Sequence, residues 1–340
     1  MFLNTELFGH QRGASNRGYK KIKYGTMVLS TQNLHLGNAN VNLRFKHGMV
    51  SPAYKTYDIT GCSIELLAHW IKSDAAKHFF YNATTVGASM CRRNVEWETL
   101  YEQPLFLPSP DEQDKIASIL SILAQRIDVQ QKYVAALKKY KRGLNHKLLS
   151  EIDEQYNREL GTVCSIVGGG TPDTLRPDYW EGNVEWFTPS EIGKSKYVLS
   201  SLRKISQVGL SNSSAKSLPS GTVLLTTRAT LGEMSIARSE CSTNQGFQSL
   251  VSDSKRVLPE YLYYLQILIK PWCEKYASGN TFREISKASL SKCVVPVPCL
   301  NSQKRIVCIL SRIDELIETH ERVEDSLTQI KEGLLQQLFI

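Results

Sequence analysis

The residues most able to do chemistry in this sequence lie in four polar loops of its second half. These loops combine glycine with basic, aromatic or amide side chains: residues 168–186 read GGGTPDTLRPDYWEGNVEW, 226–232 read TTRATLG, 242–246 read STNQG and 278–284 read SGNTFRE. Glycine lets a backbone approach another surface closely, and backbone N–H groups can contact phosphate oxygens. The adjacent amides in STNQG are able to read adenine edges in a major groove. The pattern favours nucleic-acid binding, and ordinary turns around core aromatic residues are the plain alternative.

The sequence lacks the motifs of common catalytic sites. It contains no GxxxxGK[ST] phosphate loop, no HExxH, no GxSxG and no Asn-Pro-Pro-aromatic tetrapeptide of the kind that amino-methyltransferases use. Carboxylate pairs such as Glu315 and Glu318 fall on the polar side of a helical pattern, where solvation is their simplest role. We therefore expect a protein that binds rather than one that catalyses.

Composition agrees with a basic, globular chain. The 340 residues include 41 Lys and Arg against 33 Asp and Glu, which gives a net charge of +8 and makes a polyanion a plausible partner. The length suggests two domains. No apolar run is long enough to cross a bilayer, and the N-terminus lacks the apolar core of a signal peptide. The eight cysteines form neither CxxC nor a zinc-like cluster, so we expect reduced thiols in a cytoplasmic protein without a metal site.

An internal repeat organises the chain. Residues 107–150 align without a gap on residues 297–340, and the stretch GTMVLS at 25–30 resembles GTVLLT at 221–226. We therefore expect two copies of one unit, each a globular domain followed by a long helix. The first copy is shorter, because its first residue aligns near residue 197 of the second. Identical residues of the helical parts include Gln113/Gln303, Ser121/Ser311, Lys141/Lys331 and Gly143/Gly333.

Both helical stretches show heptads with apolar residues at positions a and d. Each run of about 38 residues would span roughly 57 Å, and its apolar stripe must be buried against a partner, for which the other copy is the obvious candidate. Gln130 and His320 interrupt the stripes at the same place, where an antiparallel pair would let them meet, although other pairings remain open. Gly143 and Gly333 would fit either a close backbone approach or fraying helix ends. The expected interface residues are Ile116, Ile119, Leu123, Gln130, Leu137, Leu144, Ile306, Ile309, Ile313, His320, Leu327 and Leu334.

Shorter apolar runs predict the globular parts. Residues 222–226 and 247–251 have the pattern of strands, whereas residues 64–71 and 261–269 have the pattern of helices. The fold expected from these elements is a mixed α/β or α+β domain.

Five motifs of the second copy, in their order, resemble the specificity subunit of type I restriction–modification systems. They read GGGTPDTLRPDYWEGNVEWFTPSEI, SLPSGTVLLTTRATLGEMSIA, STNQGFQSL, SGNTFREI and VPVPCLNSQKRI, and the first copy matches through GYKKIKYGTMVLS, GMVSPAY and PLFLPSPDEQDKI. The resemblance implies two α/β target-recognition domains separated by two long antiparallel coiled-coil helices. Its boundaries here would be 1–110 for the first domain, 111–150 for the first spacer helix, 151–158 for a linker, 159–300 for the second domain and 301–340 for the second spacer helix.

The resemblance also implies a division of labour. Such a subunit is non-catalytic: it binds double-stranded DNA at a bipartite target and positions two methyltransferase subunits and the restriction subunits. S-adenosylmethionine, ATP and Mg²⁺ would then belong to those partners. One departure is that the first copy has no counterpart of residues 160–196. The first recognition domain is therefore expected to be incomplete, through an internal start or a divergent subtype.

The loops supply the candidate DNA contacts. If Arg228 reads a guanine, its loss should relax preference at one position, whereas a uniform loss would indicate a phosphate contact. The candidates are Thr171, Arg176, Tyr179, Arg228, Asn244, Gln245, Phe282 and Arg283 in the second copy, and Lys20, Lys21, Lys23, Arg44, Arg92 and Arg93 in the first.

Two other functions remain open on the sequence alone. A coiled-coil scaffold whose globular domains bind proteins would show no salt-dependent DNA association. A recognition-defective remnant would assemble with methyltransferase subunits but fail to select a full site. An enzymatic function, which would need a catalytic arrangement that the sequence does not reveal, is the third choice.

Overall fold

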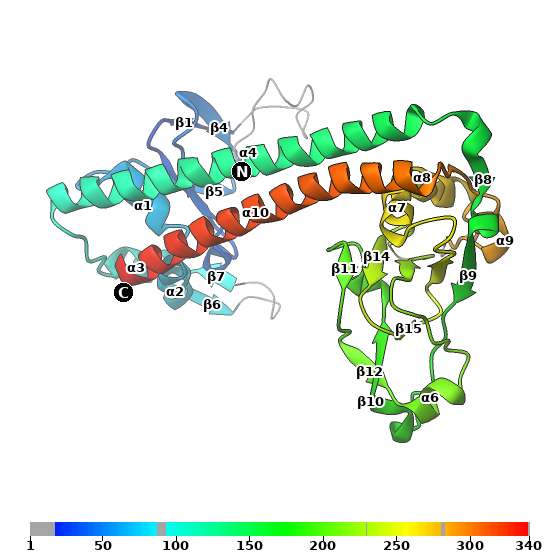
Figure 1. The fold of residues 1–340 in the computed structure, drawn as a ribbon. Coiled ribbons are helices and arrows are strands. Elements are labelled where there is room, and N and C mark those ends of the chain that lie inside the picture. Colours follow the sequence, from blue (N-terminus) through cyan, green and yellow to red (C-terminus); the bar gives the residue numbers. More distant parts are fainter. Residues whose placement is uncertain (1–17, 87–92, 229, 280–282, 339–340) are drawn as a thin grey trace. The chain divides into compact units, whose positions relative to one another are not determined.

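The computed structural model describes residues 18–86, 93–228, 230–279 and 283–338, which divide into two compact units (Figure 1). The first unit contains residues 1–134 and 319–340, and the second contains residues 135–318. Each combines a globular part with a portion of each of two long helices, α4 (Pro110–Ser150) and α10 (Leu300–Leu338). The expected α/β class with two long helices is confirmed. The division into recognition domains at the expected residues stays a prediction.

The second unit is built on a five-stranded mixed sheet in the order β11-β14-β13-β16-β9. Its central strand β13 is buried along its whole length, as a run of three apolar residues predicts. Val223 and Leu225 belong to the core cluster formed with the helices, and Leu224 belongs to the cluster of Phe187 and Phe247. The strands are β9 (Cys164–Gly168), β11 (Tyr197–Val198), β13 (Val223–Leu225), β14 (Met234–Ala237) and β16 (Gln248–Ser252).

Smaller elements complete this unit. Strand β10 (Trp180–Phe187) lies between β12 (Arg203–Ile205), to which it is antiparallel, and β15 (Cys241–Thr243), to which it is parallel. Strands β8 (Asn157–Glu159) and β17 (Val294–Pro296) form an antiparallel pair. The helices are α5 (Leu160–Val163), α6 (Gln207–Ser211), α7 (Pro259–Tyr264), α8 (Gln266–Tyr276) and α9 (Lys287–Ser291).

The first unit has smaller sheets around one core. The three-stranded sheet has the order β3-β2-β5, and β1 pairs with β4 and β6 with β7, all antiparallel. Its core joins β2 and β3 to the following helices and to Leu120 of α4 and Leu335 of α10. The elements are β1 (Lys20–Lys23), β2 (Met27–Ser30), β3 (Ala39–Val41), β4 (His47–Val50), β5 (Tyr54–Tyr57), α1 (Ile64–Trp70), α2 (Asp74–Asn82), β6 (Thr84–Val86), β7 (Arg93–Val95) and α3 (Trp97–Glu102).

Helices α4 and α10 pack against each other in antiparallel orientation, as one of the open pairings predicted (Figure 1). The two polar interruptions meet: Gln130 Nε2 lies 2.8 Å from both Nδ1 and the carbonyl oxygen of His320. The ring of Tyr133 packs edge-on against His320, with ring centroids 4.6 Å apart. A polar pair in an apolar seam fixes the register of two helices, which is the role we assign to these residues.

The expected position d is wrong at Ile119 and Ile309. The a residues Gln130 and His320 face the seam, but Ile119 and Ile309 are exposed, at 54% and 42% of their surface. The residue one position later is buried in each helix, at Leu120 and Leu310. The buried residues therefore follow the a row at an i, i+4 spacing. Each helix carries apolar residues on both sides of its a row, and at these positions the side that includes Leu120 and Leu310 is the buried one. The other expected residues are partly or fully buried, namely Ile116, Leu123, Leu137, Leu144, Ile306, Ile313, Leu327 and Leu334.

Within each unit, the globular part docks on the helices through the same glutamine. Gln113 Oε1 accepts the N–H of Ser63, just before α1, at 2.8 Å, and Gln303 Oε1 accepts the N–H of Leu258, just before α7, at 2.9 Å. Each glutamine Nε2 also donates to the carbonyl five residues earlier, at 2.9 and 2.8 Å. Both glutamines are buried. This matched contact explains why the repeat keeps a polar residue at that position.

A second matched contact uses the repeated serine. Ser121 Oγ lies 3.1 Å from Nε2 of His69 on α1, and Ser311 Oγ lies 3.1 Å from the hydroxyl of Tyr264 on α7. The pKa of His69 is lowered to about 4, mainly by burial and further by the charge of Lys331.

The second unit adds a charged network at this contact. The buried Lys196 donates to the Tyr264 hydroxyl and to Ser311 Oγ, both at 2.8 Å. The Tyr264 hydroxyl donates to Asp314 at 2.6 Å, and Asp314 also pairs with Lys141 of α4. Burial lowers the pKa of Lys196, and the charge of Asp314 opposes that shift. The network therefore joins the globular part to both long helices of the unit.

The two repeated helix glycines have no packing role. An added Cβ at Gly143 or Gly333 would meet no atom within 4 Å. Of the two explanations open on the sequence, a close backbone approach is therefore wrong.

Candidate nucleic-acid interface

Four segments of the second unit that carry predicted contacts are joined by backbone hydrogen bonds. The N–H of Gly170 donates to Thr243 O at 2.9 Å, and that of Thr227 donates to Gly246 O at 2.8 Å. The N–H of Ile285 in turn donates to Thr227 O at 3.3 Å. The loops that follow β9, β13 and β15, and the segment before α9, therefore converge at one place.

Four predicted side chains lie on the loops that follow β9, β13 and β15. Thr171 donates its hydroxyl hydrogen to Gln245 Oε1, and Asn244 Oδ1 accepts the N–H of Gly246 at 2.8 Å. Arg228 is partly buried, with its Nε beside Gly246. Among the described residues, none accepts a hydrogen bond from the two amide NH₂ groups. Those groups and the Arg228 guanidinium remain able to donate to base or phosphate acceptors.

The GGG segment packs inside the unit instead of presenting an open phosphate cradle. An added Cβ at Gly169 would lie 2.0 Å from Asn244 O, and one at Gly170 would lie 2.2 Å from Ser214 Oγ. These glycines thus allow the close approach expected of them, but the surface approached belongs to neighbouring loops of the same unit.

Arg176 and Tyr179 lie at a different place, in the turn before β10. Nε and Nη2 of Arg176 donate to the two carboxylate oxygens of Asp178 at 3.0 and 2.9 Å, and its guanidinium lies 5.0 Å from the Tyr179 ring. The bond to Arg176 lowers the pKa of Asp178, and the same bond raises the pKa of Arg176. This arginine therefore carries its own counter-charge.

Arg283 is also used within the unit. Its Nη2 donates to the carbonyl oxygens of Glu274 and Ala277 at the end of α8. That contact satisfies carbonyls that a helix end leaves without partners. Two other candidates, Phe282 and Arg92, lie outside the described residues.

In the first unit, three lysines lie on β1. Lys20 donates to Tyr54 O at 2.6 Å, and Lys23 pairs with the exposed Asp58 at 3.2 Å. Lys21 is exposed, and no described residue pairs with it.

The first unit's arginines differ from each other. Arg44, between β3 and β4, is exposed, and its guanidinium lies 5.1 Å from the Phe45 ring. Arg93 on β7 donates to Oγ1 and O of Thr84 at 2.8 and 2.6 Å and lies 4.1 Å from the Tyr81 ring. Arg93 therefore braces β6 against β7, whereas Arg44 stays available beside the β1–β4 pair.

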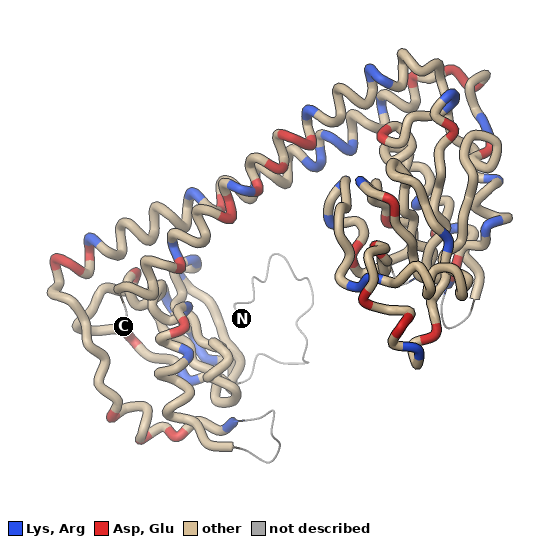
Figure 2. The backbone as a smooth tube through the Cα atoms, turned by 60° about the horizontal axis from the view of Figure 1, so that its bottom comes forward, with Lys and Arg blue, Asp and Glu red and all other residues tan. Residues whose placement is uncertain are grey.

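Sequence reasoning missed the basic pair Arg203-Lys204 on β12. Basic and acidic residues both occur over the second unit (Figure 2), but residues 192–232 contain Lys and Arg without any Asp or Glu, so the charge along this stretch could have indicated the pair. Lys204 pairs with Glu185 at 2.6 Å. Burial by itself raises the pKa of Glu185, but hydrogen bonds from Lys204 and Ser201 lower it overall. Arg203 instead lies against Trp180, 3.8 Å from the ring centroid.

Among the described residues, no His, Cys, Asp and Glu side chains cluster in threes that could hold a metal ion. No helix within the described ranges is both long and apolar enough to cross a membrane.

Comparison with known proteins agrees with this arrangement. Residues 152–329 match the model of the type I restriction modification DNA specificity domain. The specificity subunit of type I restriction enzyme MjaIX from Methanocaldococcus jannaschii is 32% identical over 187 residues, which are 54% of this chain and 43% of that protein. The EcoR124I/EcoR124II specificity subunit from Escherichia coli is 25% identical over 71% of this chain and 63% of its own length. These matches span less than two thirds of either relative.

A solved structure shares the fold. A chain from a study of complex assembly and conformational transition of the type I R-M system superposes with a TM-score of 0.61 at 21% identity. The superposition covers 96% of this chain and 84% of that one.

Proposed function

Because the chain belongs to the type I restriction–modification DNA specificity family, we propose that it recognises DNA for such a complex and is not itself catalytic. The observation that carries the proposal is the matched docking of a globular part on the helices within each unit, through Gln113 and Gln303. A bipartite target requires two reading modules on one stiff spacer, since the distance between half-sites is then fixed. The duplicated docking supports such an arrangement.

We propose that the joined loops of the second unit read base edges. Arg228, Asn244 and Gln245 keep donors that no described residue uses, and donors of these types pair with guanine and adenine in the major groove. In the first unit we assign Lys21 and Arg44 to the DNA, because no described residue forms a hydrogen bond or ion pair with either side chain. Of the other described candidates, the cations would have to exchange an internal bond for DNA, namely Lys20, Lys23, Arg93, Arg176 and Arg283.

We propose that the methyltransferase subunits bind the long helices, and that restriction subunits join that assembly. The row at the misassigned d position exposes apolar side chains on both helices. Single exposed apolar residues are ordinary, but a row along a helix is typical of a protein interface. S-adenosylmethionine, ATP and Mg²⁺ would act in those partners. The exposed residues of this row are Ile119 and Tyr140 on α4 and Ile309, Leu316, Val323 and Ile330 on α10, and Ile122 and Val129 of α4 are exposed directly before the a row.

The test is co-expression with the cognate methyltransferase subunit, followed by single-molecule sequencing for methylated adenine. We expect one gapped motif. Arg228→Ala should cost about 1–3 kcal/mol and relax preference at one position of that motif. Gln155→Ala, at an exposed glutamine outside the loops, serves as the control and should leave the motif unchanged.

Other outcomes separate the alternatives. An assembled complex that methylates a single ungapped half-site would indicate a recognition-defective remnant. Assembly without salt-dependent DNA binding or methylation would refute the proposal and favour a protein-binding scaffold.

A further inference from the structure

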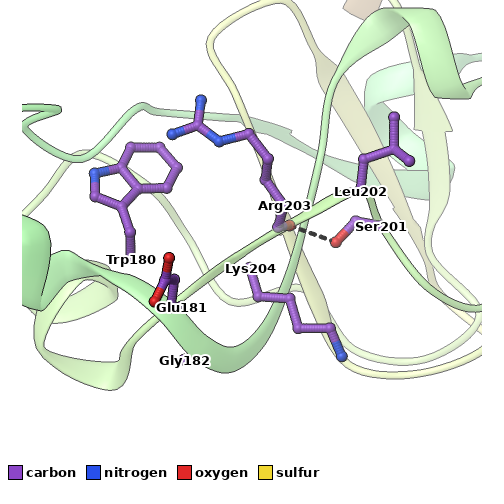
Figure 3. Close-up of a pocket in the computed structure, with 7 residues that line it drawn as sticks. All are labelled: Trp180, Glu181, Gly182, Ser201, Leu202, Arg203 and Lys204. Atoms are coloured by element: carbon purple, nitrogen blue, oxygen red, sulfur yellow. Dashed lines mark hydrogen bonds between the residues drawn. The ribbon is translucent and has the colours of Figure 1, made fainter.

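A cavity of about 470 Å³ opens between β10 and β12 of the second unit (Figure 3). No candidate contact predicted from the sequence lines it. Its lining combines one indole, two cations, one carboxylate and a large aliphatic side chain. The lining residues are Trp180, Glu181, Gly182, Ser201, Leu202, Arg203 and Lys204.

The cavity results from an irregularity in the pairing of the two strands. Both Trp180 and Val184 pair with Ile205, so the residues between them bulge out of the ladder. Glu181 adopts a positive φ of 60°, which is rare for a residue with a side chain. An added Cβ at Gly182 would lie 2.3 Å from the Cα of Ser206. The bulge that frames the opening is therefore a feature of the backbone.

Two tryptophans form a fixed wall beside the opening. Trp180 donates its indole N–H to Asp173 O at 3.1 Å and packs edge-on against Trp186, with centroids 5.2 Å apart. Trp186 is buried and donates its own indole N–H to Gly170 O at 2.9 Å. The second bond connects this wall to the loops that carry the candidate base contacts.

Arg203 is the cation held against that wall. Its guanidinium carbon lies 3.8 Å from the Trp180 centroid and 5.5 Å from that of Trp186, and such stacking orients the planar group. Among the described residues, none accepts a hydrogen bond from the guanidinium. The nearby carboxylate of Glu185 is occupied by Lys204 and Ser201.

The remaining carboxylate of the cavity does not occupy the arginine. Glu181 is exposed, and Figure 3 shows its carboxylate on the other side of Trp180 from the guanidinium. Leu202 beside Arg203 exposes 86% of its surface, so this rim carries no covering segment in the described chain.

These features fit a phosphate diester. A stacked guanidinium presents its N–H edge as a fork that matches two phosphate oxygens. A guanidinium can also donate to a guanine edge, so the methylated motif of an Arg203 variant must separate a base contact from a phosphate contact. One stacked cation with a carboxylate nearby is a weak site for free phosphate, but it suffices as one contact among several on a duplex.

We propose that Arg203, held on Trp180, binds a backbone phosphate of the DNA and so orients the second unit on its half-site. The inference rests on the proposed function, because it needs DNA as the partner. The contact positions the protein without carrying sequence information.

The test uses the full chain assembled with its methyltransferase subunits and a duplex that contains the methylated motif. Binding is measured between 0.05 and 0.5 M salt for wild type, Arg203→Ala and Arg203→Lys. The loss of one phosphate contact should reduce the slope of log K against log salt by about 0.9, which corresponds to about eightfold in affinity over one decade of salt. Arg203→Lys keeps the charge and should keep most of the slope.

Arg238→Ala is the matched control. Arg238 is also exposed and stacked at 3.8 Å, on Tyr197, but the Tyr197 hydroxyl bonds the carboxylate of Glu260. The control should retain the wild-type slope. Arg203→Ala should weaken cognate and non-cognate duplexes equally and leave the methylated motif unchanged.

Several results would overturn the assignment. These are an unchanged slope in Arg203→Ala, an equal loss in Arg238→Ala, or a relaxed motif in Arg203→Ala, which would indicate a base contact. If the wild-type complex itself binds DNA without salt dependence, the proposed function fails, and that outcome is distinct from a failure of Arg203 alone.

Discussion

Replacing Asp314 by asparagine should destabilise the second unit by about 2–3 kcal/mol. The carboxylate accepts the Tyr264 hydroxyl and pairs with Lys141, and its charge supports the ammonium of buried Lys196. Asparagine keeps an acceptor for Tyr264 but leaves both lysines without this counter-charge. Removing one partner of a buried pair costs about 3–5 kcal/mol. We reduce that figure because 15% of the Asp314 side chain and 23% of the Lys141 side chain remain exposed.

The matching change at Lys196 separates a charge effect from a packing effect. Lys196→Met keeps the aliphatic stem and removes the buried charge, while Tyr264 and Ser311 can still bond each other across 3.1 Å. We expect that variant to lose less than about 1 kcal/mol. In the double variant, no ammonium remains at position 196 to lose its counter-charge. The double variant should therefore lose about 1–2 kcal/mol less than the sum of the two single losses.

Hydrogen exchange of the full chain, read by mass spectrometry on peptides from α7 and α10, measures the local stability of the second unit in each variant. Exposed positions on the same helices give the controls Lys139→Met on α4 and Asp325→Asn on α10, which should exchange like wild type. An Asp314→Asn variant within about 0.5 kcal/mol of wild type would refute the reasoning. So would a double variant that loses the sum of the two single losses.

Two further predictions concern the first unit and the helices. Because the folded chain holds the His69 pKa at about 4, against an ordinary 6.5, its contribution to stability is complete above pH 6.5. As the pH falls from 6.5 to 4, the unfolded chain takes up a proton that the folded chain refuses, so the first unit should lose about 1–2 kcal/mol, after allowance for the water-facing part of the ring. Urea unfolding across that range should show a smaller loss for His69→Gln, and equal losses would contradict the assignment. Gly143→Ala and Gly333→Ala each add a methyl group in open space and should raise the free energy of unfolding by about 0.5–1 kcal/mol. A lower urea midpoint for either variant would show that its glycine has a role not visible in its contacts.

The helices and their pairing were accessible from the sequence because both depend on periodic and repeated residues. The identities Gln113/Gln303 and Ser121/Ser311 mark docking contacts that each unit makes in the same way. The sequence did not reveal which side of the a row faces the partner helix. Apolar residues flank the a row on both sides, and the choice between Ile119 and Leu120 depends on how the partner helix packs.

The network at Lys196 shows a second limit of sequence reasoning. Its members come from the loop before β11, from α7 and from both long helices, so no local spacing relates them. The repeat offers no help either, because the first copy has no counterpart of the segment that ends at Lys196. A buried lysine is rare without a partner, but the identity of that partner is settled only by the tertiary fold.

The same limit governs which arginines are available to DNA. A loop position indicates that a guanidinium lies near the surface, but its readiness to bind depends on whether the chain already supplies acceptors. Arg176 has a carboxylate two residues away, and Arg283 has carbonyls at a helix end, so binding DNA would require each to give up existing bonds. Arg203 stacks on two aromatic rings and gives up no hydrogen bond within the described chain. Stacking thus orients a cation without occupying its hydrogen-bond donors. This distinction, which no sequence spacing reveals, is why we place a phosphate at Arg203 rather than at Arg176 or Arg283.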